Sequence, residues 1–101
     1  MESKITTLVE KAKEGDTDAF SILYQFFYPK MRGICIKILK EDKDVVDDLV
    51  QDAFILALTS IKNLKNSKKF SQWLIREIFR RHMQLVGIKG NLTLRSWLAR
   101  L

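Results

Sequence analysis

The sequence predicts an all-α fold, a compact bundle of about four to five helices. Three observations predict it. Apolar side chains recur at helical spacing along nearly all of the 101 residues. Glycine occurs 4 times and proline once, which is too rare for a turn-rich β-sandwich or barrel. Apolar residues make up 47% and charged residues 30% of the chain, as expected for a globular protein with one modest core.

The first helix is predicted from four apolar residues that share one face at spacings of i, i+3, i+4 and i+7: Ile5, Leu8, Val9 and Ala12. Gly15 can end this helix in the left-handed conformation, because it has no Cβ. Asp16 can then cap the helix that follows.

A long second helix over residues 17–40 is predicted because one apolar stripe keeps its register on both sides of Pro29. The stripe consists of Phe20, Leu23, Tyr24, Phe27, Met31, Ile34, Cys35 and Ile38. Proline removes one backbone donor, so we expect a kink near Pro29 rather than a break. Cys35 lies on the stripe, and we expect a small core residue there rather than a reactive thiol.

The remaining elements follow from a polar turn over residues 41–44. A third helix is predicted over residues 44–62, a Lys/Asn-rich loop over residues 63–67 and a fourth helix over residues 68–86. Gly87 to Gly90 interrupts the pattern, and a short last helix is indicated by Leu94, Trp97, Leu98 and Leu101. We therefore expect one helical domain over residues 1–86, followed by a short segment over residues 87–101 that is a helix or a truncated linker.

The third helix divides into an apolar half and an acidic half. Its core side holds Val45, Val46, Leu49, Val50, Ala53, Phe54, Leu56, Ala57 and Ile61. The other side holds Asp44, Asp47, Asp48, Gln51 and Asp52, with Ile55 and Leu58 among them. The first three of these acids also suit the positive end of the helix dipole. Such a face can dock against a basic, partly apolar partner, or it is an ordinary solvated face with two exposed aliphatic residues.

The fourth helix also has two sides, and its outer side is basic. We expect its core side to hold Phe70, Leu74, Ile75, Ile78, Phe79, His82, Leu85 and Val86. The outer side holds Lys69, Trp73, Arg76 and Arg80 at spacings of i, i+4, i+7 and i+11. Cations can hold phosphates while the indole stacks on a base or sugar. Alternatively, Trp73 packs back onto the domain beneath the Lys and Arg stems.

The loop before the fourth helix combines amides with lysines. It contributes Asn63, Lys65, Asn66, Ser67 and Lys68. Amides can hydrogen-bond the edge of an unstacked base, and lysines can follow a phosphate backbone. The same composition also suits a plain exposed turn.

The charge is distributed unevenly along the chain. Residues 1–58 carry 11 Asp/Glu and 8 Lys/Arg, a net charge of −3. Residues 59–101 carry 10 Lys/Arg and the single acid Glu77, a net charge of +9. So basic a block suits a polyanion, nucleic acid first of all, although a solvated basic surface is the simpler alternative.

Several function classes are excluded or disfavoured. One cysteine allows no intramolecular disulfide and fits a reducing compartment. One histidine and one cysteine do not make a usual zinc site. The carboxylates have no accompanying histidine, cysteine or glycine-rich loop, so we expect neither an enzyme nor a cofactor. The sequence has no signal peptide and no membrane span, which makes a cytoplasmic protein the expectation.

Three motifs in this order resemble bacterial sigma factors of the extracytoplasmic-function type. Gly15–Phe20 followed by Leu23 and Tyr24 is similar to their opening segment. Asp47–Phe54 (DDLVQDAF) is similar to their polymerase-binding helix, and Phe70–Arg76 (FSQWLIR) to their promoter-melting segment. The resemblance covers about residues 5–82.

The sequence also departs from the family's pattern. Over Glu77–Gln84 the family's usual Asn and Asp are missing. The family normally continues into a second helical domain that reads the minus-thirty-five element. We therefore expect either a fragment or a one-domain relative with an altered role.

The resemblance implies the sigma region two fold and two contacts. The residues that would bind the clamp helices of the RNA polymerase β′ subunit are Asp44, Asp47, Asp48, Gln51, Asp52 and Ile55. The residues that would engage the minus-ten promoter element are Asn63, Lys65, Asn66, Ser67, Lys68, Lys69, Trp73, Arg76 and Arg80. Asn63 to Lys68 would lie near an extruded base of the non-template strand.

The implied partners are RNA polymerase core, promoter DNA and, where one exists, an anti-sigma factor. Two alternatives stay open. One is a sigma-like interaction module or regulator that binds polymerase or another partner without reading DNA. The other is a basic DNA-binding helical domain unrelated to polymerase, which leaves the acidic pattern of Asp47 to Asp52 without a purpose.

Overall fold

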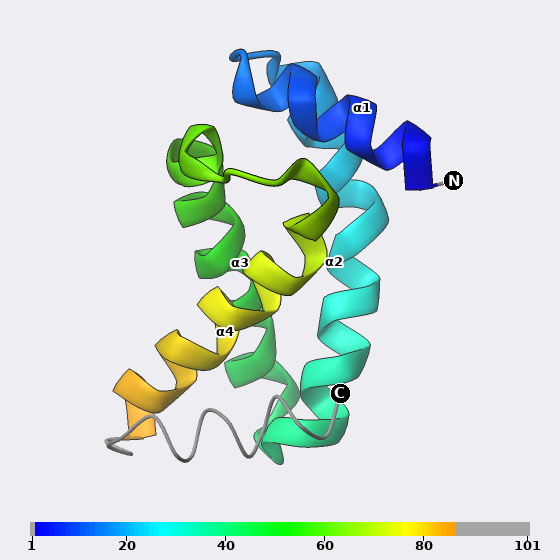
Figure 1. Ribbon diagram of the computed structural model, residues 1–101. Helices are drawn as coiled ribbons and strands as arrows, with labels where there is room; N and C mark the ends of the chain where they lie inside the picture. The colour runs from blue at the N-terminus through cyan, green and yellow to red at the C-terminus, as the bar shows by residue number, and fades with distance from the viewer. Residues whose placement is uncertain (1, 87–101) are drawn as a thin grey trace.

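The computed structural model describes residues 2–86, and every regular element within them is helical (Figure 1). The elements in order are α1 (Glu2–Lys13), α2 (Thr17–Leu39), α3 (Lys43–Ser60), the short 3₁₀ turns η1 (Ile61–Asn63) and η2 (Ser67–Lys69), and α4 (Phe70–Val86). The predicted all-α class is confirmed. The predicted interruption at Gly87 to Gly90 and the last helix around Trp97 lie outside the described residues.

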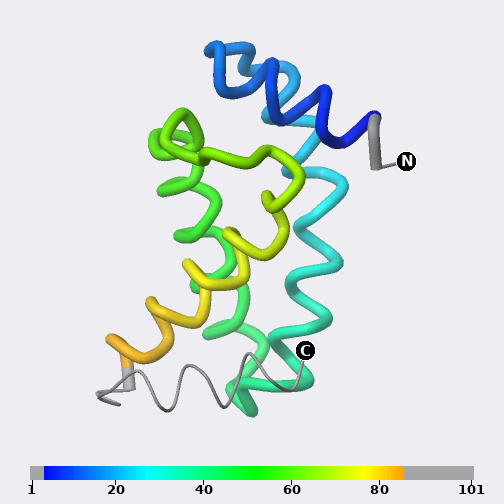
Figure 2. The backbone as a smooth tube through the Cα atoms, viewed as in Figure 1, coloured from blue at the N-terminus to red at the C-terminus, as the bar shows by residue number. Residues whose placement is uncertain are grey.

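The helices pack in chain order. α1 contacts α2, α2 contacts α3, and α3 contacts α4. Figure 1 shows α1 across one end of α2, with α4 running obliquely over α3. The tube in Figure 2 shows the connection between α3 and α4 passing beneath α1, which contacts both η1 and η2. The first helix therefore supports the loop that precedes α4.

Local sequence signals explain the ends of the first two helices. Gly15 has a φ of 99°, a left-handed conformation that favours glycine. The Asp16 carboxylate then accepts a hydrogen bond from the backbone N–H of Ala19 at 3.0 Å and caps α2. Both outcomes confirm the sequence prediction. α2 continues through Pro29, so the prediction of one long helix holds.

The core lies where the helical stripes meet. Phe54 of α3 is 2% exposed, and its ring meets that of Tyr24 at 4.9 Å and that of Phe20 at 6.4 Å, both edge-on. Cys35 is fully buried, and burial raises the pKa of its thiol to about 12. A protonated, buried thiol confirms the expected core role of Cys35.

Leu85 corrects the prediction for α4. We expected it on the core side, but it is 62% exposed. It belongs to the last turn of α4, where the helix has passed the buried contacts of Ile78 and His82. The helical stripe predicted the face on which Leu85 lies, but not how far along α4 the core extends.

Candidate functional site

The outer side of α3 is an acidic surface with exposed apolar side chains. Ile55 is 67% exposed and Leu58 is 49% exposed. We call this side the acidic face of α3, and its exposed members are Asp44, Asp48, Gln51, Asp52, Ile55 and Leu58. The prediction that Ile55 and Leu58 point away from the core is confirmed. Two exposed aliphatic side chains among carboxylates suit a partner that is both basic and apolar.

Asp47 differs from the other acids, because its carboxylate is held by α2. Oδ1 of Asp47 accepts hydrogen bonds from Nε of Arg32 and from the hydroxyl of Tyr28. Its side chain is only 33% exposed. We expected Asp47 on the outward acidic side, but the structure places it at the α2–α3 contact. Its position between Arg32 and Tyr28 suits it to fixing the orientation of α3.

Tyr28 and Arg32 were missed as site residues. The pKa of Tyr28 is raised, chiefly by burial and further by the neighbouring Asp47. The sequence contained one signal for them, since positions i and i+4 on a helix face the same neighbour. The acidic face of α3 is therefore held from behind by a polar pair on α2.

Asp52 joins the two candidate surfaces. Its Oδ2 accepts a hydrogen bond from Arg81 of α4 at 3.2 Å. The two side chains are 49% and 37% exposed, so water reaches both. This ion pair places a cation of the basic helix beside a carboxylate of the acidic one.

The loop before α4 is exposed except at Leu64 and Ser67, which are buried. Asn63, Lys65, Asn66 and Lys68 are exposed, and so are Lys69 and Arg76 beyond them. Asn66 uses its side-chain oxygen to accept from the backbone N–H of Lys68 at 3.1 Å, which caps η2. Ser67 is 5% exposed, and its hydroxyl accepts from Nζ of Lys13 at 3.4 Å. Ser67 thus differs from the expectation of an exposed loop residue.

Trp73 and Arg80 are less free than the helical wheel indicated. The Trp73 ring is half-buried and lies 5.9 Å from the Phe70 ring, packed against the core. Arg80 donates to Oε1 of Glu77, whose side chain is only 11% exposed. The packing of Trp73 follows the alternative in which the indole lies back on the domain, and its side chain is only partly buried there.

His82 ties α4 to the turn between α2 and α3. It is 3% exposed, and its Nε2 lies 2.8 Å from Oε2 of Glu41. Within residues 2–86, no three His, Cys, Asp or Glu side chains gather closely enough to hold a metal ion. No helix in this described part has the length and apolar character that crossing a membrane requires.

Comparison with known proteins matches this chain to a family. The family described as Sigma-70 region 2 matches residues 23–85, a span that contains α3 and all of α4 except its last residue. The ECF RNA polymerase sigma factor SigW of Bacillus subtilis is 33% identical over 76 residues, which are 75% of this chain and 40% of that protein. The ECF RNA polymerase sigma-E factor of Haemophilus influenzae is 32% identical over 69 residues, 68% of this chain and 35% of that protein.

A third relative agrees with the first two. The RNA polymerase sigma-H factor of Pseudomonas aeruginosa is also 32% identical over 69 residues, 68% of this chain and 35% of its own length. The chain therefore spans 40% or less of the curated relatives it matches. No solved structure gives a significant match.

Proposed function

This chain belongs to the Sigma-70 region 2 family, and we propose that it acts in transcription initiation as a sigma-factor domain. In this proposal it binds RNA polymerase core through the acidic face of α3 and promoter DNA through α4 and the loop before it. The observation that carries the proposal is the 67% exposure of Ile55 among Asp48, Gln51 and Asp52. Burying an exposed aliphatic side chain against a partner is favourable, but the carboxylates around it are buried at the same time. The partner surface must therefore also offer cations.

The polymerase contact would use the clamp helices of the β′ subunit. Asp48 and Asp52 are one helical turn apart, and Ile55 follows one turn beyond, so all three can meet one partner helix. Charge attraction would guide the encounter, and burial of Ile55 and Leu58 would supply much of the affinity.

The DNA contact would use the exposed cations that precede and begin α4. Four of these cations form no ion pair with a carboxylate in the described part of the chain: Lys65, Lys68, Lys69 and Arg76. They would hold phosphates of the minus-ten element, while Asn63 and the half-buried Trp73 would meet an unstacked base. Extruding a base costs a few kcal/mol, which stacking and hydrogen bonds in a pocket offset, so the domain would shift a melting equilibrium without covalent chemistry.

Capture of polymerase tests the first half. Purified core polymerase, or an isolated β′ clamp-helix fragment, is pulled down with the parent chain and with the double variant Asp48→Lys and Asp52→Lys. The matched control is Glu10→Lys with Glu14→Lys, which makes the same charge change at two exposed positions, one on α1 and one in the turn that follows it. We expect the parent and the control to capture polymerase and the α3 variant to lose capture with unchanged helicity. Equal capture by the α3 variant refutes the polymerase contact.

Promoter opening tests the second half. Core polymerase charged with the parent chain, or with a larger sigma protein that contains it, is assayed for open complex by permanganate reactivity of the minus-ten element. Lys69→Ala with Arg76→Ala should reduce opening while capture of polymerase is retained, because both side chains are exposed and outside the core. The salt dependence of DNA binding should also become weaker, by the amount expected for about two lost phosphate contacts.

A second candidate function is a sigma-like module that binds polymerase or another partner without reading DNA. The specific observation in its favour is that Arg80 is paired with Glu77 and that Trp73 packs on Phe70. It predicts capture of polymerase with no open complex, and unchanged behaviour of the Lys69 and Arg76 variant. Open complex formed by the parent chain and lost in that variant excludes it.

A further inference from the structure

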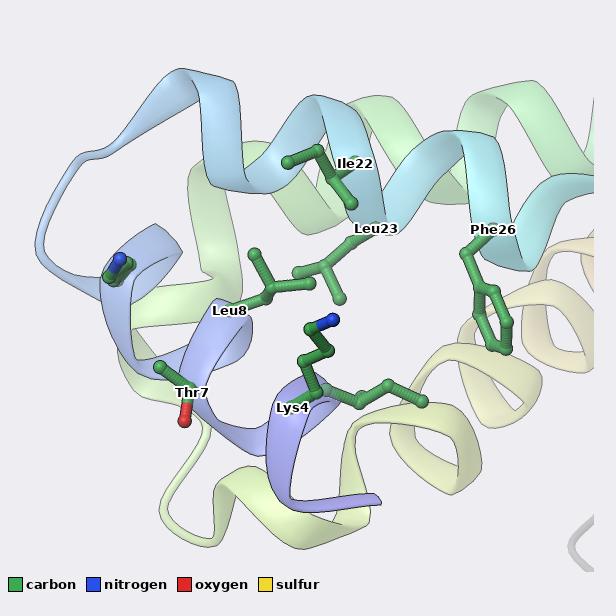
Figure 3. A pocket seen from close by; sticks show the side chains of 8 residues that line it. Lys4, Thr7, Leu8, Ile22, Leu23 and Phe26 are labelled. Atoms are coloured by element: carbon green, nitrogen blue, oxygen red, sulfur yellow. The ribbon is translucent and has the colours of Figure 1, made fainter. Parts of the chain in front are cut away.

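A groove between α1 and α2 lies apart from the acidic face of α3 and from the basic residues of α4. It has a volume of about 570 Å³. Figure 3 shows Ile22, Leu23 and Phe26 entering it from α2, opposite Lys4, Thr7 and Leu8 of α1. Ile5 and Lys11 complete its lining.

The groove presents apolar side chains that the fold does not cover. Leu23 is fully buried and forms part of the floor, whereas Ile22 is 51% exposed and Phe26 is 36% exposed. Ile22 and Phe26 are one helical turn apart, so they form a continuous apolar edge along α2. Nζ of Lys30 lies over the Phe26 ring, 5.2 Å from its centroid. Neighbouring exposed side chains of this size are typical of a surface that a partner covers.

The charged residues of the lining are all cations. Among the residues that the structure describes, Lys4 and Lys11 line the groove and no Asp or Glu does. These lysines are seven residues apart on α1, which is two turns or about 10 Å along the helix. A ligand that fits both the apolar floor and this rim therefore carries carboxylates about two helical turns apart.

We propose that this groove binds an amphipathic helix of a partner protein, with apolar side chains against Ile22 and Phe26 and acidic side chains beside Lys4 and Lys11. An amphipathic helix is a common occupant of an apolar groove, because it lays its apolar face into the groove. Charge decides against the chain's own residues 87–101, which contain Lys89, Arg95 and Arg100 but no acid. The site is separate from both surfaces of the proposed function, so it would be available while they are engaged.

The test uses the full chain and two stapled helical peptides of about 15 residues, a length at which the staple secures the helix. Both carry leucines along one face. One carries Glu, and the other Lys, at flanking positions seven residues apart. By fluorescence anisotropy we expect the acidic peptide to bind at least about tenfold more tightly than the basic one. Equal affinity, or no binding of either, overturns the proposal.

Two variants locate the peptide and read its charge. Ile22→Gln should weaken binding of the acidic peptide about tenfold, and the matched control Leu85→Gln, at an exposed leucine near the end of α4, should not. Lys4→Glu with Lys11→Glu should reverse the preference toward the basic peptide, which a merely structural role of these lysines would not do. A retained preference for the acidic peptide refutes the charge assignment.

Two further readouts separate this proposal from its neighbours. Ile22→Gln should leave capture of core polymerase unchanged, so failure of the groove and failure of the acidic face are distinguishable. By sedimentation, we expect the parent chain not to self-associate through this groove. Self-association of the parent chain that Ile22→Gln abolishes would mean that a second copy occupies the groove and that the proposed partner is wrong.

Discussion

Asp47 holds α3 in place, whereas its neighbours on the acidic face of α3 are proposed to contact a partner. Its carboxylate accepts from Arg32 and from Tyr28, both on α2. Asp48 and Asp52, its neighbours in the same motif, are exposed. We predict that Asp47→Asn lowers the stability of the domain but leaves capture of polymerase nearly intact.

The structure sets the size of the effect. The Arg32 and Asp47 side chains are 35% and 33% exposed, so water screens their attraction. A pair of this kind contributes about 0.2–1 kcal/mol. Asn keeps a carbonyl oxygen that can accept from the Tyr28 hydroxyl, so most of the loss is the charge. We expect Asp47→Asn to cost about 0.5–1 kcal/mol, a small part of the roughly 5–15 kcal/mol of a typical domain.

A double-mutant cycle measures this contribution. Urea unfolding followed by circular dichroism is carried out on the parent, Asp47→Asn, Arg32→Met and the combination. The expected coupling energy is about 0.5–1 kcal/mol. In parallel, Asp47→Asn should retain polymerase capture within about twofold, whereas Asp48→Asn with Asp52→Asn should lose at least about tenfold. Coupling near zero, or equal losses of capture, would refute the assignment of Asp47 to the interior support of α3.

Three further predictions concern the fold. Phe54→Ala should cost about 3–5 kcal/mol in urea unfolding, because it removes the buried ring that joins α3 to the aromatic side chains of α2; a loss under about 1 kcal/mol would contradict it. Asp16→Ala should cost about 1 kcal/mol through loss of the cap on Ala19, with a smaller loss for Asp16→Asn. The raised pKa of Cys35, about 12 against an ordinary 9.0, means that its burial contributes stability that is complete below about pH 9 and is lost as the pH rises toward 12. The stability difference between the parent and Cys35→Ala, measured from pH 7 to 12, should fall in that window, and a difference that is constant over it would show that the thiol is not held protonated.

The course of the chain was predictable because its signals are local. Apolar spacing, the cap at Asp16 and the left-handed Gly15 each depend on a few neighbouring residues, and all three occur in the structure as predicted. Leu85 shows the limit of periodicity. The wheel assigns it to the core side, but only the tertiary packing decides where along α4 the core ends.

The candidate surfaces were predictable in composition but not in pairing. The exposure of Ile55 and Leu58 followed from the wheel of one helix. The contacts of Asp47 with Arg32, and of Ser67 with Lys13, join residues far apart in sequence. No pattern within a single helix contains that information, so residues that looked equally exposed divide into supports and free groups only in the folded chain.

If the two proposed surfaces act together, the ion pair between Asp52 and Arg81 is a contact that joins them. Both side chains are partly exposed, so the pair contributes only about 0–1 kcal/mol to folding. A cation from a partner docked on the acidic face of α3 could therefore replace Arg81 at Asp52 at little cost. Arg81 would then be released on α4, the helix that also carries Arg76. A weak internal pair is better suited to such an exchange than a strong one, because a buried, fully paired Asp52 would have to be freed before any partner could use it.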